Sequence, residues 1–267
     1  MNFIASHLVM IKNTISLLYT GYASTVMIIA FIVHLSTTII TYKLPDHGRT
    51  IDYFIVRWVL KTAFFFAGIR IKVKGLENIP KSEPFIIASN HQSMLDILAY
   101  YIAIPHPISF FAKKELEKAP FIGRIVKYQH YAVDRKNPKQ GIKELKKVGE
   151  RIKKGQSAII FPEGTRSSDG LIKPFKRGMF SLSVEHETAI VPCYISGMFQ
   201  VMNKNRLRVA PGKVLIQILP PIKPVLGDET QKKAAVSLMK MTENNLIEVE
   251  NELINSSNVN STSKNSL

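Results

Sequence analysis

Residues 85 to 96 read FIIASNHQSMLD, an apolar run that passes directly into a polar segment and then into the start of a helical pattern. A short apolar run rich in Ile and Phe is typical of a buried strand. Since His91 and Asp96 follow this run at once, they lie where a strand gives way to a helix. Such connections, repeated along a chain, are characteristic of α/β folds.

The same alternation continues on both sides of this stretch. Strands are predicted at the apolar runs 71–74, 85–88, 108–111, 131–133, 158–161, 189–192 and 213–216, and helices at 94–104, 141–154, 179–186 and 229–253. Residues 70–254 are therefore expected to form one α/β domain. The proline in the run Val191-Pro192 predicts an edge or bulge position for its strand, because proline cannot donate a hydrogen bond to a ladder.

The N-terminal region is expected to bind a membrane. Residues 14–41 contain no Lys, Arg, Asp or Glu, and a membrane span needs about 20 apolar residues, which this segment supplies. Because Gly21, His34 and several hydroxyl groups dilute it, a re-entrant helical hairpin in one leaflet is an equal alternative, and a buried core helix a lesser one. More cations follow the segment than precede it, which predicts that the next domain faces the cytoplasm.

The segment 53–68 carries Arg57 and Lys61 on one face of an amphipathic helical pattern. Such a helix lies along a bilayer surface or packs on a protein core, and the pattern fits both. We therefore expect residues 1–69 to form membrane-anchoring helices. At the other end, residues 255–267 are almost all Asn and Ser and are expected to form a disordered tail.

The composition narrows the class of partner. The 267 residues include 36 Lys and Arg against 20 Asp and Glu, a net charge of +16, which favours an anionic partner. Because 46% of the residues are hydrophobic, acidic lipid is favoured over nucleic acid. The single cysteine, Cys193, excludes an intramolecular disulfide and suits a reducing cytosol. The histidines are scattered and no Cys/His cluster occurs, so no metal site is expected.

The pair His91 and Asp96 has the residue types of a general base and its orienting acid. A neutral imidazole held by a carboxylate can take a proton from a hydroxyl that attacks a carbonyl. At a spacing of five the two side chains meet only if His91 precedes the first helical turn, as it would with Ser93 at the N-cap. The alternative is that Ser93 and Asp96 form a capping-box-like pair and His91 merely packs nearby.

A second polar segment, FPEGTRS at 161–167, again follows a strong apolar strand. Gly164 allows a turn with positive φ, and the guanidinium of Arg166 matches phosphate oxygens, so the segment predicts an anion cradle. An ordinary polar turn is the alternative. The basic run 173–178 either extends the cradle or forms solvated surface. Arg135, at the end of another strand, either reaches the same sheet edge or pairs with Asp134.

Taken together, these segments resemble the 1-acyl-sn-glycerol-3-phosphate acyltransferase (lysophosphatidic acid acyltransferase) family. The likeness runs from about Gly75 to Gly197 and includes a His-four-residues-Asp box, the strand before Arg135, the heptad 161–167 and the Val191-Pro192 box. It implies a mixed, largely parallel sheet flanked by helices, with N-terminal membrane helices. It also implies acyl transfer from acyl-coenzyme A or acyl carrier protein to the sn-2 hydroxyl of lysophosphatidic acid, giving phosphatidic acid for phospholipid synthesis.

The resemblance also implies roles for individual residues. His91 would be the general base and Asp96 would fix its tautomer, while an oxyanion would be stabilised by main-chain amides near Lys113 or Ser93. The substrate-binding set that it implies is Lys113, Arg135, Glu163, Gly164, Thr165 and Arg166. No cofactor is expected besides the acyl donor, and the expected location is the inner, cytoplasmic membrane, in contact with its lipids.

Three other functions remain open from the sequence. A sister acyltransferase could use glycerol 3-phosphate, another lysophospholipid or a lyso-ornithine lipid as acceptor. A non-catalytic basic protein could bind membranes or nucleic acid through the same positive charge. A lipid hydrolase would use water in place of the lipid hydroxyl, although the chain lacks the Gly-x-Ser-x-Gly elbow of such enzymes.

Overall fold

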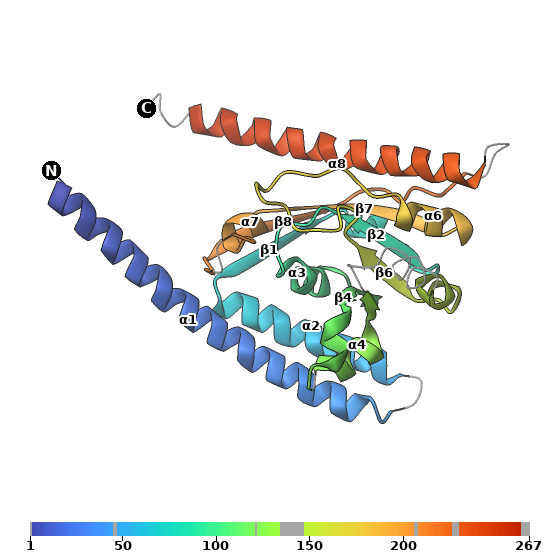
Figure 1. Ribbon diagram of the computed structural model, residues 1–267, viewed down its shortest axis with the longest axis horizontal. Coiled ribbons are helices and arrows are strands. Elements are labelled where there is room, and N and C mark those ends of the chain that lie inside the picture. Colours follow the sequence, from blue (N-terminus) through green and yellow to red (C-terminus); the bar gives the residue numbers. More distant parts are fainter. Residues whose placement is uncertain are drawn as a thin grey trace.

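The computed structural model describes residues 2–44, 47–120, 122–133, 147–205, 208–225 and 230–262. A central sheet lies between two groups of helices (Figure 1). The helices are α1 (Asn2–Thr41), α2 (Gly48–Phe66), α3 (Asp96–Ala103), α4 (Ile122–Gln129), α6 (Gly178–Glu185), α7 (Met198–Val201) and α8 (Gln231–Thr262), with 3-10 turns η1 (Leu76–Asn78) and η2 (Lys114–Lys118). The strands are β1 (Ile69–Lys74), β2 (Phe85–Ser89), β3 (Ile108–Ser109), β4 (Phe111–Lys113), β5 (Tyr131–Val133), β6 (Ser157–Ile160), β7 (Ala189–Ser196) and β8 (Gly212–Ile218).

The main sheet has six strands in the order β1-β8-β7-β2-β6-β3. Only the β7–β8 pair is antiparallel among these neighbours, so the predicted mixed, largely parallel sheet is confirmed. Since β2 pairs in parallel with both β6 and β7, the carboxyl ends of these strands meet at one edge. Open α/β sheets bind their ligands at such an edge.

One strand prediction was wrong in detail, and for Pro192 only one of the two predicted alternatives holds. The predicted strand 108–111 is divided between β3 of the main sheet and β4, which pairs with β5 in a separate sheet. Pro192 does not lie on an edge strand, because β7 is central. Its carbonyl accepts the N–H of Leu219 at 2.9 Å, just past the end of β8. The pairing of β7 shifts by one residue between Cys193–Ile218 and the bridge Ile190–Ile222, so Pro192 lies at a bulge, the other position that the sequence predicts.

The central strand β2 is buried along its whole length, and its side chains divide between two hydrophobic cores. Phe85 and Ile87 belong to the core shared with α2 and α3, whereas Ile86 and Ala88 belong to the core shared with α6 and α8. This division follows from the alternation of side chains across a strand. Because each buried large apolar side chain stabilises the fold by about 1.5–3 kcal/mol, the strand that precedes His91 is firmly held.

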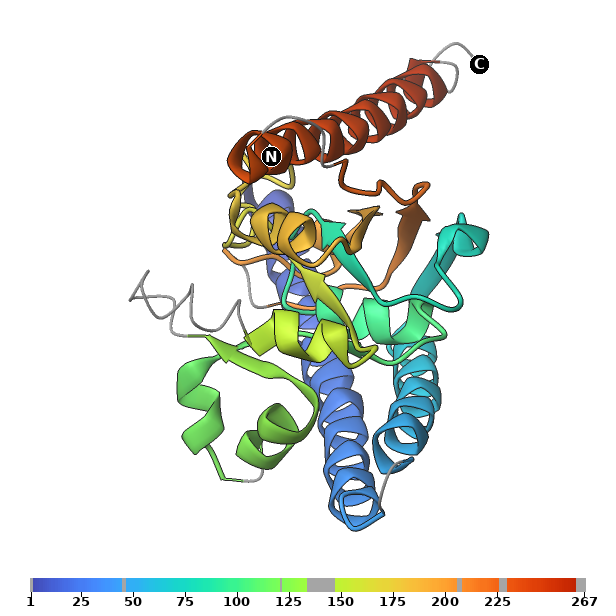
Figure 2. The same ribbon diagram turned by 90° about the vertical axis from the view of Figure 1, so that its right-hand side faces the viewer.

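The predicted membrane segment is one uninterrupted helix. No turn breaks α1 between Asn2 and Thr41, so residues 14–41 do not form a hairpin by themselves. Instead α1 forms a hairpin with α2, which lies alongside it (Figure 2). The tyrosine hydroxyl of Tyr19 donates to the carbonyl of Ala67, joining the two helices at the sheet end. By length and composition α1 could cross a membrane, and large apolar side chains such as Leu18 and Trp58 are exposed on both helices.

The C-terminal helix is longer than the sequence predicts. Its helical pattern was expected to end at Leu253, but α8 continues to Thr262, through the first part of the segment expected to be disordered. Helix extension adds one hydrogen bond for each residue fixed, and the lower helix propensity of Asn and Ser costs only a few tenths of a kcal/mol per residue. Residues 263–267 lie outside the described part of the chain.

Candidate active site

The site is built on the carboxyl ends of β2, β6 and β7. Directly after β2, the side-chain amide of Asn90 donates to the carbonyl of Ile195 at 2.9 Å and accepts its N–H at 2.8 Å. These bonds attach the connection after β2 to β7, and β6 leads into the heptad 161–167 on the other side. The polar segments that the sequence singled out are therefore neighbours in space.

His91 and Asp96 lie in direct contact. His91 Nδ1 is 2.8 Å from Asp96 Oδ2, and His91 precedes the first turn of α3 as this contact requires. With Nδ1–H donating to the carboxylate, Nε2 is left as an acceptor. The predicted N-cap was wrong: α3 has Leu95 at this position without a side-chain cap, and Ser93 Oγ accepts only the N–H of Leu95, at 3.2 Å.

The environment of Asp96 determines its role. Its side chain is fully buried, and burial raises the pKa of the Asp96 carboxyl, an effect opposed by the hydrogen bond from His91 and by main-chain donors. The N–H groups of Gln92 and Ser93 reach Oδ2 at 2.7 and 2.8 Å. The sequence suggested two sources of oxyanion donors, main-chain amides near Lys113 or at the helix start by Ser93. The Ser93 amide itself is already engaged with Asp96.

The heptad 161–167 encloses His91 rather than standing apart from it. The ring of Phe161 stacks on the imidazole, with centroids 3.9 Å apart and planes 14° apart. Glu163 Oε1 accepts the main-chain N–H of His91 at 2.9 Å. The N–H of Ser167 donates to the His91 carbonyl at 2.7 Å. The ring face and both main-chain polar groups of His91 are thus held by one segment.

Glu163 is a buried carboxyl, only 5% exposed. Burial raises its pKa to about 7, although the hydrogen bond from His91 and the charge of Lys173 act in the opposite direction. Its second oxygen, Oε2, is buried and has no hydrogen-bond partner within the described residues. The sequence reading placed Glu163 in the substrate-binding set, whereas its observed contact is with the main chain of His91.

Gly164 closes a tight turn. Its N–H donates to the carbonyl of Phe161 at 3.0 Å, and its φ of +75° is one that side chains rarely adopt. A Cβ here would also lie 2.7 Å from Lys176 Nζ. Because the Lys176 N–H donates to the carbonyl of Pro162 at 2.9 Å, this lysine of the basic run 173–178 belongs to the turn.

The remaining predicted substrate residues fall into two groups. Thr165 is exposed and Arg166 is half-buried, and across the described part of the chain Arg166 makes no hydrogen bond or ion pair. With Lys176 it presents positive charge beside the backbone turn, as an anion site requires. The side chain of Lys113, in β4, and all of Arg135 lie outside the described residues.

Sequence reasoning missed several residues of the site. Asn90, Phe161 and Ser167 belong to the motifs, but the sequence does not predict that they hold His91, and it leaves two alternatives open for Lys176. A polar amide directly after a buried strand was the available signal for Asn90. For the contacts of Phe161 and Ser167 there was none, because they depend on β6 lying beside β2.

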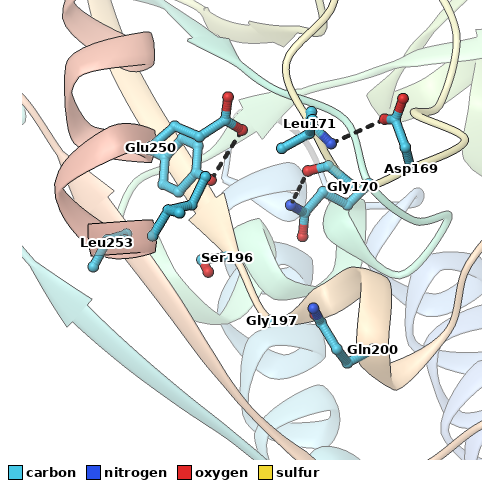
Figure 3. Close-up of a pocket in the computed structure, with 11 residues that line it drawn as sticks. Asp169, Gly170, Leu171, Ser196, Gly197, Gln200, Glu250 and Leu253 are labelled. Atoms are coloured by element: carbon cyan, nitrogen blue, oxygen red, sulfur yellow. Dashed lines mark hydrogen bonds between the residues drawn. The ribbon is translucent and has the colours of Figure 1, made fainter. Parts of the chain in front are cut away.

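A separate polar cavity of about 280 Å³ opens between α8 and the loop after the heptad (Figure 3). Gln92 forms part of its wall, donating to the Gly170 carbonyl at 2.9 Å and accepting the Phe199 N–H at 3.2 Å. Its lining contains the carboxyl groups of Asp169 and Glu250 and no Lys or Arg from the described residues. It therefore does not suit a phosphate. In the part of the chain that the structure describes, no cluster of His, Cys, Asp and Glu could hold a metal ion.

Comparisons with known proteins agree with this arrangement. A family model described as Acyltransferase matches residues 70–196. The chain is 32% identical over 179 residues to the 1-acyl-sn-glycerol-3-phosphate acyltransferase alpha of Mus musculus, covering 66% of this chain and 63% of the mouse protein. It is 38% identical over 140 residues to the 1-acyl-sn-glycerol-3-phosphate acyltransferase of Cocos nucifera, covering 52% and 46% of the two chains. The chain thus spans less than two thirds of these relatives.

A solved structure matches over a longer stretch. The crystal structure of the 1-acyl-sn-glycerophosphate (LPA) acyltransferase PlsC from Thermotoga maritima superposes with a TM-score of 0.68 at 28% sequence identity. The match covers 88% of this chain and 96% of that one. The structural match therefore extends beyond residues 70–196, the part of the chain that the family model matches.

Proposed function

Because the chain belongs to the lysophosphatidic acid acyltransferase family, we propose that it acylates the sn-2 hydroxyl of lysophosphatidic acid to give phosphatidic acid. The acyl donor is a thioester, either acyl-coenzyme A or the acylated form of acyl carrier protein. The observation that carries the proposal is the 2.8 Å contact between His91 Nδ1 and Asp96 Oδ2 beside the turn with Arg166 and Lys176.

His91 Nε2 takes the proton of the acceptor hydroxyl as the oxygen attacks the thioester carbonyl. Asp96 stabilises the imidazolium that forms, and proton removal of this kind is typically worth about 10²–10⁴ in rate. The tetrahedral intermediate then collapses by breaking the C–S bond. The departing thiolate receives the proton from His91, which leaves an ester, a free thiol and a neutral imidazole.

The phosphate of the acceptor lies against the turn in this proposal. Arg166 offers a planar pair of donors and Lys176 a point charge, and the main chain at Gly164 allows close approach. Thr165, Arg135 and Lys113 are further candidates for contact with the substrate.

The α1–α2 hairpin explains how the site reaches its substrates. Each methylene withdrawn from a bilayer into water costs about 0.8 kcal/mol, so a long-chain acceptor is best met at the membrane. We propose that residues 1–69 anchor the catalytic domain, 70–254, to the cytoplasmic membrane with that domain in the cytoplasm. The excess of Lys and Arg then attracts anionic lipid, at about 1 kcal/mol for each cation near the surface.

The test is an assay of the purified protein in lipid–detergent micelles. The donors are coenzyme A and acyl carrier protein, each carrying a labelled acyl group. Acceptors would be lysophosphatidic acid, glycerol 3-phosphate, lysophosphatidylcholine and a lyso-ornithine lipid. We expect labelled phosphatidic acid with at least one donor, and a rate lowered by about 10²–10⁴ with His91→Ala. Preference for an acceptor without a free phosphate, or fatty acid release without acylated lipid, would overturn the proposal.

A further inference from the structure

The heptad 161–167 holds His91 from several directions at once. Phe161 covers one face of the imidazole, Ser167 holds the main-chain carbonyl, and Glu163 holds the main-chain N–H. Asp96 holds Nδ1. Among these contacts, only the one from Glu163 comes from an ionisable side chain outside the His–Asp pair. The contact runs through the backbone, so Glu163 influences where the ring lies without touching its nitrogen atoms.

The burial of Glu163 favours a role in holding His91 over a role in binding the substrate. A carboxylate that contacts a substrate must present an oxygen to the space that the substrate enters. Glu163 Oε1 is occupied by the His91 N–H, and Oε2 is buried without a partner in the described chain. Arg166, three residues later, is half-buried and has the opposite charge. The heptad therefore divides into an inner part that faces His91 and an outer part that faces solvent.

We propose that Glu163 is a positioning residue for the general base, which holds His91 by accepting its main-chain N–H and makes no contact with the acceptor. The part of this inference that concerns catalysis rests on the proposed function of His91. An oxygen at the right reach is what the role requires, and the negative charge is not. Displacing catalytic groups by about 1 Å can cost 10²-fold in rate, so a lost main-chain anchor lowers kcat.

Two substitutions separate reach from charge. Glu163→Gln keeps the length and an acceptor oxygen but has no charge, whereas Glu163→Asp keeps the charge on a shorter side chain. We expect Glu163→Gln to retain kcat within about threefold, and Glu163→Asp to lose about 10-fold to 100-fold in kcat. The KM for lysophosphatidic acid should stay within about threefold of the wild-type value in both variants. The reason is that Glu163 does not contact the acceptor, so neither substitution changes the binding of the substrate in its ground state.

Glu250 supplies a matched control. It is buried to a similar degree, at 7% exposure against 5% for Glu163, and it also accepts a main-chain N–H, that of Ile172 at 3.2 Å. It does not contact His91. Glu250→Asp shortens a buried carboxyl in the same way and should leave kcat within about threefold. A similar loss in Glu250→Asp and Glu163→Asp would show general destabilisation and overturn the proposal.

A second measurement does not depend on the acceptor. Carbethoxylation of His91 by diethyl pyrocarbonate, followed by peptide mass spectrometry, reports how firmly the imidazole is held. We expect the Glu163→Asp protein to react faster at His91 than the wild type and the Glu163→Gln protein to react at the wild-type rate. If the wild type does not acylate lysophosphatidic acid, the proposed function fails, yet this rate still tests the positioning role.

The opposite pattern overturns the inference. Greater activity in Glu163→Asp than in Glu163→Gln would show that charge matters more than reach. A raised KM with unchanged kcat would show contact with the acceptor. If Glu163→Asp does not fold, Glu163→Gln alone decides: wild-type kcat and carbethoxylation rate support the role, and loss of either refutes it.

Discussion

The ring of Phe161 lies flat on the imidazole of His91, with planes 14° apart. Replacing it with leucine keeps an apolar side chain but removes the stacked face. Aromatic pairs contribute about 0.5–1.5 kcal/mol beyond their buried area, so Phe161→Leu should lower kcat by about 2-fold to 12-fold. Phe175→Leu, which disturbs a stacked pair with Phe180 away from His91, should not. Equal losses in both variants would argue against a role for the stacking.

Substitution of the His–Asp pair should remove activity without unfolding the protein. We expect His91→Ala to lower kcat by about 10²–10⁴, the typical contribution of a general base. Asp96→Asn should act in the same direction, because an amide no longer fixes the imidazole tautomer. Circular dichroism would check that the fold is retained. Activity within tenfold of the wild type in folded His91→Ala protein would rule out this base.

Glu163 should make stability depend on pH. Its pKa is raised from 4.5 to about 7 in the folded protein, so the folded state binds more protons than the unfolded state between these values. The stabilising effect of the protonated carboxyl is complete below pH 4.5 and is lost as the pH rises through about 7.

Glu163→Gln cannot titrate and provides the reference. We expect the melting temperature of the wild type, relative to this variant, to fall as the pH rises from 4.5 to about 7. Thermal unfolding in detergent would measure it. A constant difference across this range would contradict the assigned direction of the pKa shift.

Position 164 requires glycine for two reasons, its positive φ and the close approach of Lys176. Gly164→Ala should destabilise the protein by about 1–2 kcal/mol through the positive φ and should also raise the KM for lysophosphatidic acid, because the new methyl group displaces Lys176. Gly155→Ala is the control, since Gly155 has a φ of +79° with nothing within 4 Å of an added Cβ. It should lose similar stability and keep its KM. An unchanged KM in Gly164→Ala would remove the turn from acceptor binding.

Arg166 should act on acceptor affinity rather than on the chemical step. Loss of a charge-assisted hydrogen bond costs about 1.5–3 kcal/mol, so Arg166→Gln should raise the KM for lysophosphatidic acid by about 10-fold to 150-fold. Lys223→Gln removes one exposed charge paired with Glu83 and serves as control for net charge. An equal rise in KM in both variants would point to general attraction for anionic lipid.

Much of the fold could be predicted because it depends on local patterns. The apolar runs that became β1, β2, β6, β7 and β8 were each recognisable from composition and from the polar segments that follow them. Of the two positions predicted for Pro192, the bulge is the observed one, because the pairing of β7 shifts by one residue between Cys193 and Ile190 and a missing N–H is tolerated there. The end of α8 was misplaced because helix extension depends on cooperativity more than on the propensity of each Asn or Ser.

By itself, the sequence determined the residue types of the site, the α/β class and the apolar N-terminal helix, since periodicity, charge and motif order are properties of the chain. Only the tertiary structure decided that Glu163 faces the main chain of His91 while Arg166 does not share its burial. The reason is that β6 lies beside β2 in parallel, which brings the heptad 161–167 against His91. A contact between segments so distant along the chain is set by strand pairing and burial, and no local pattern records it.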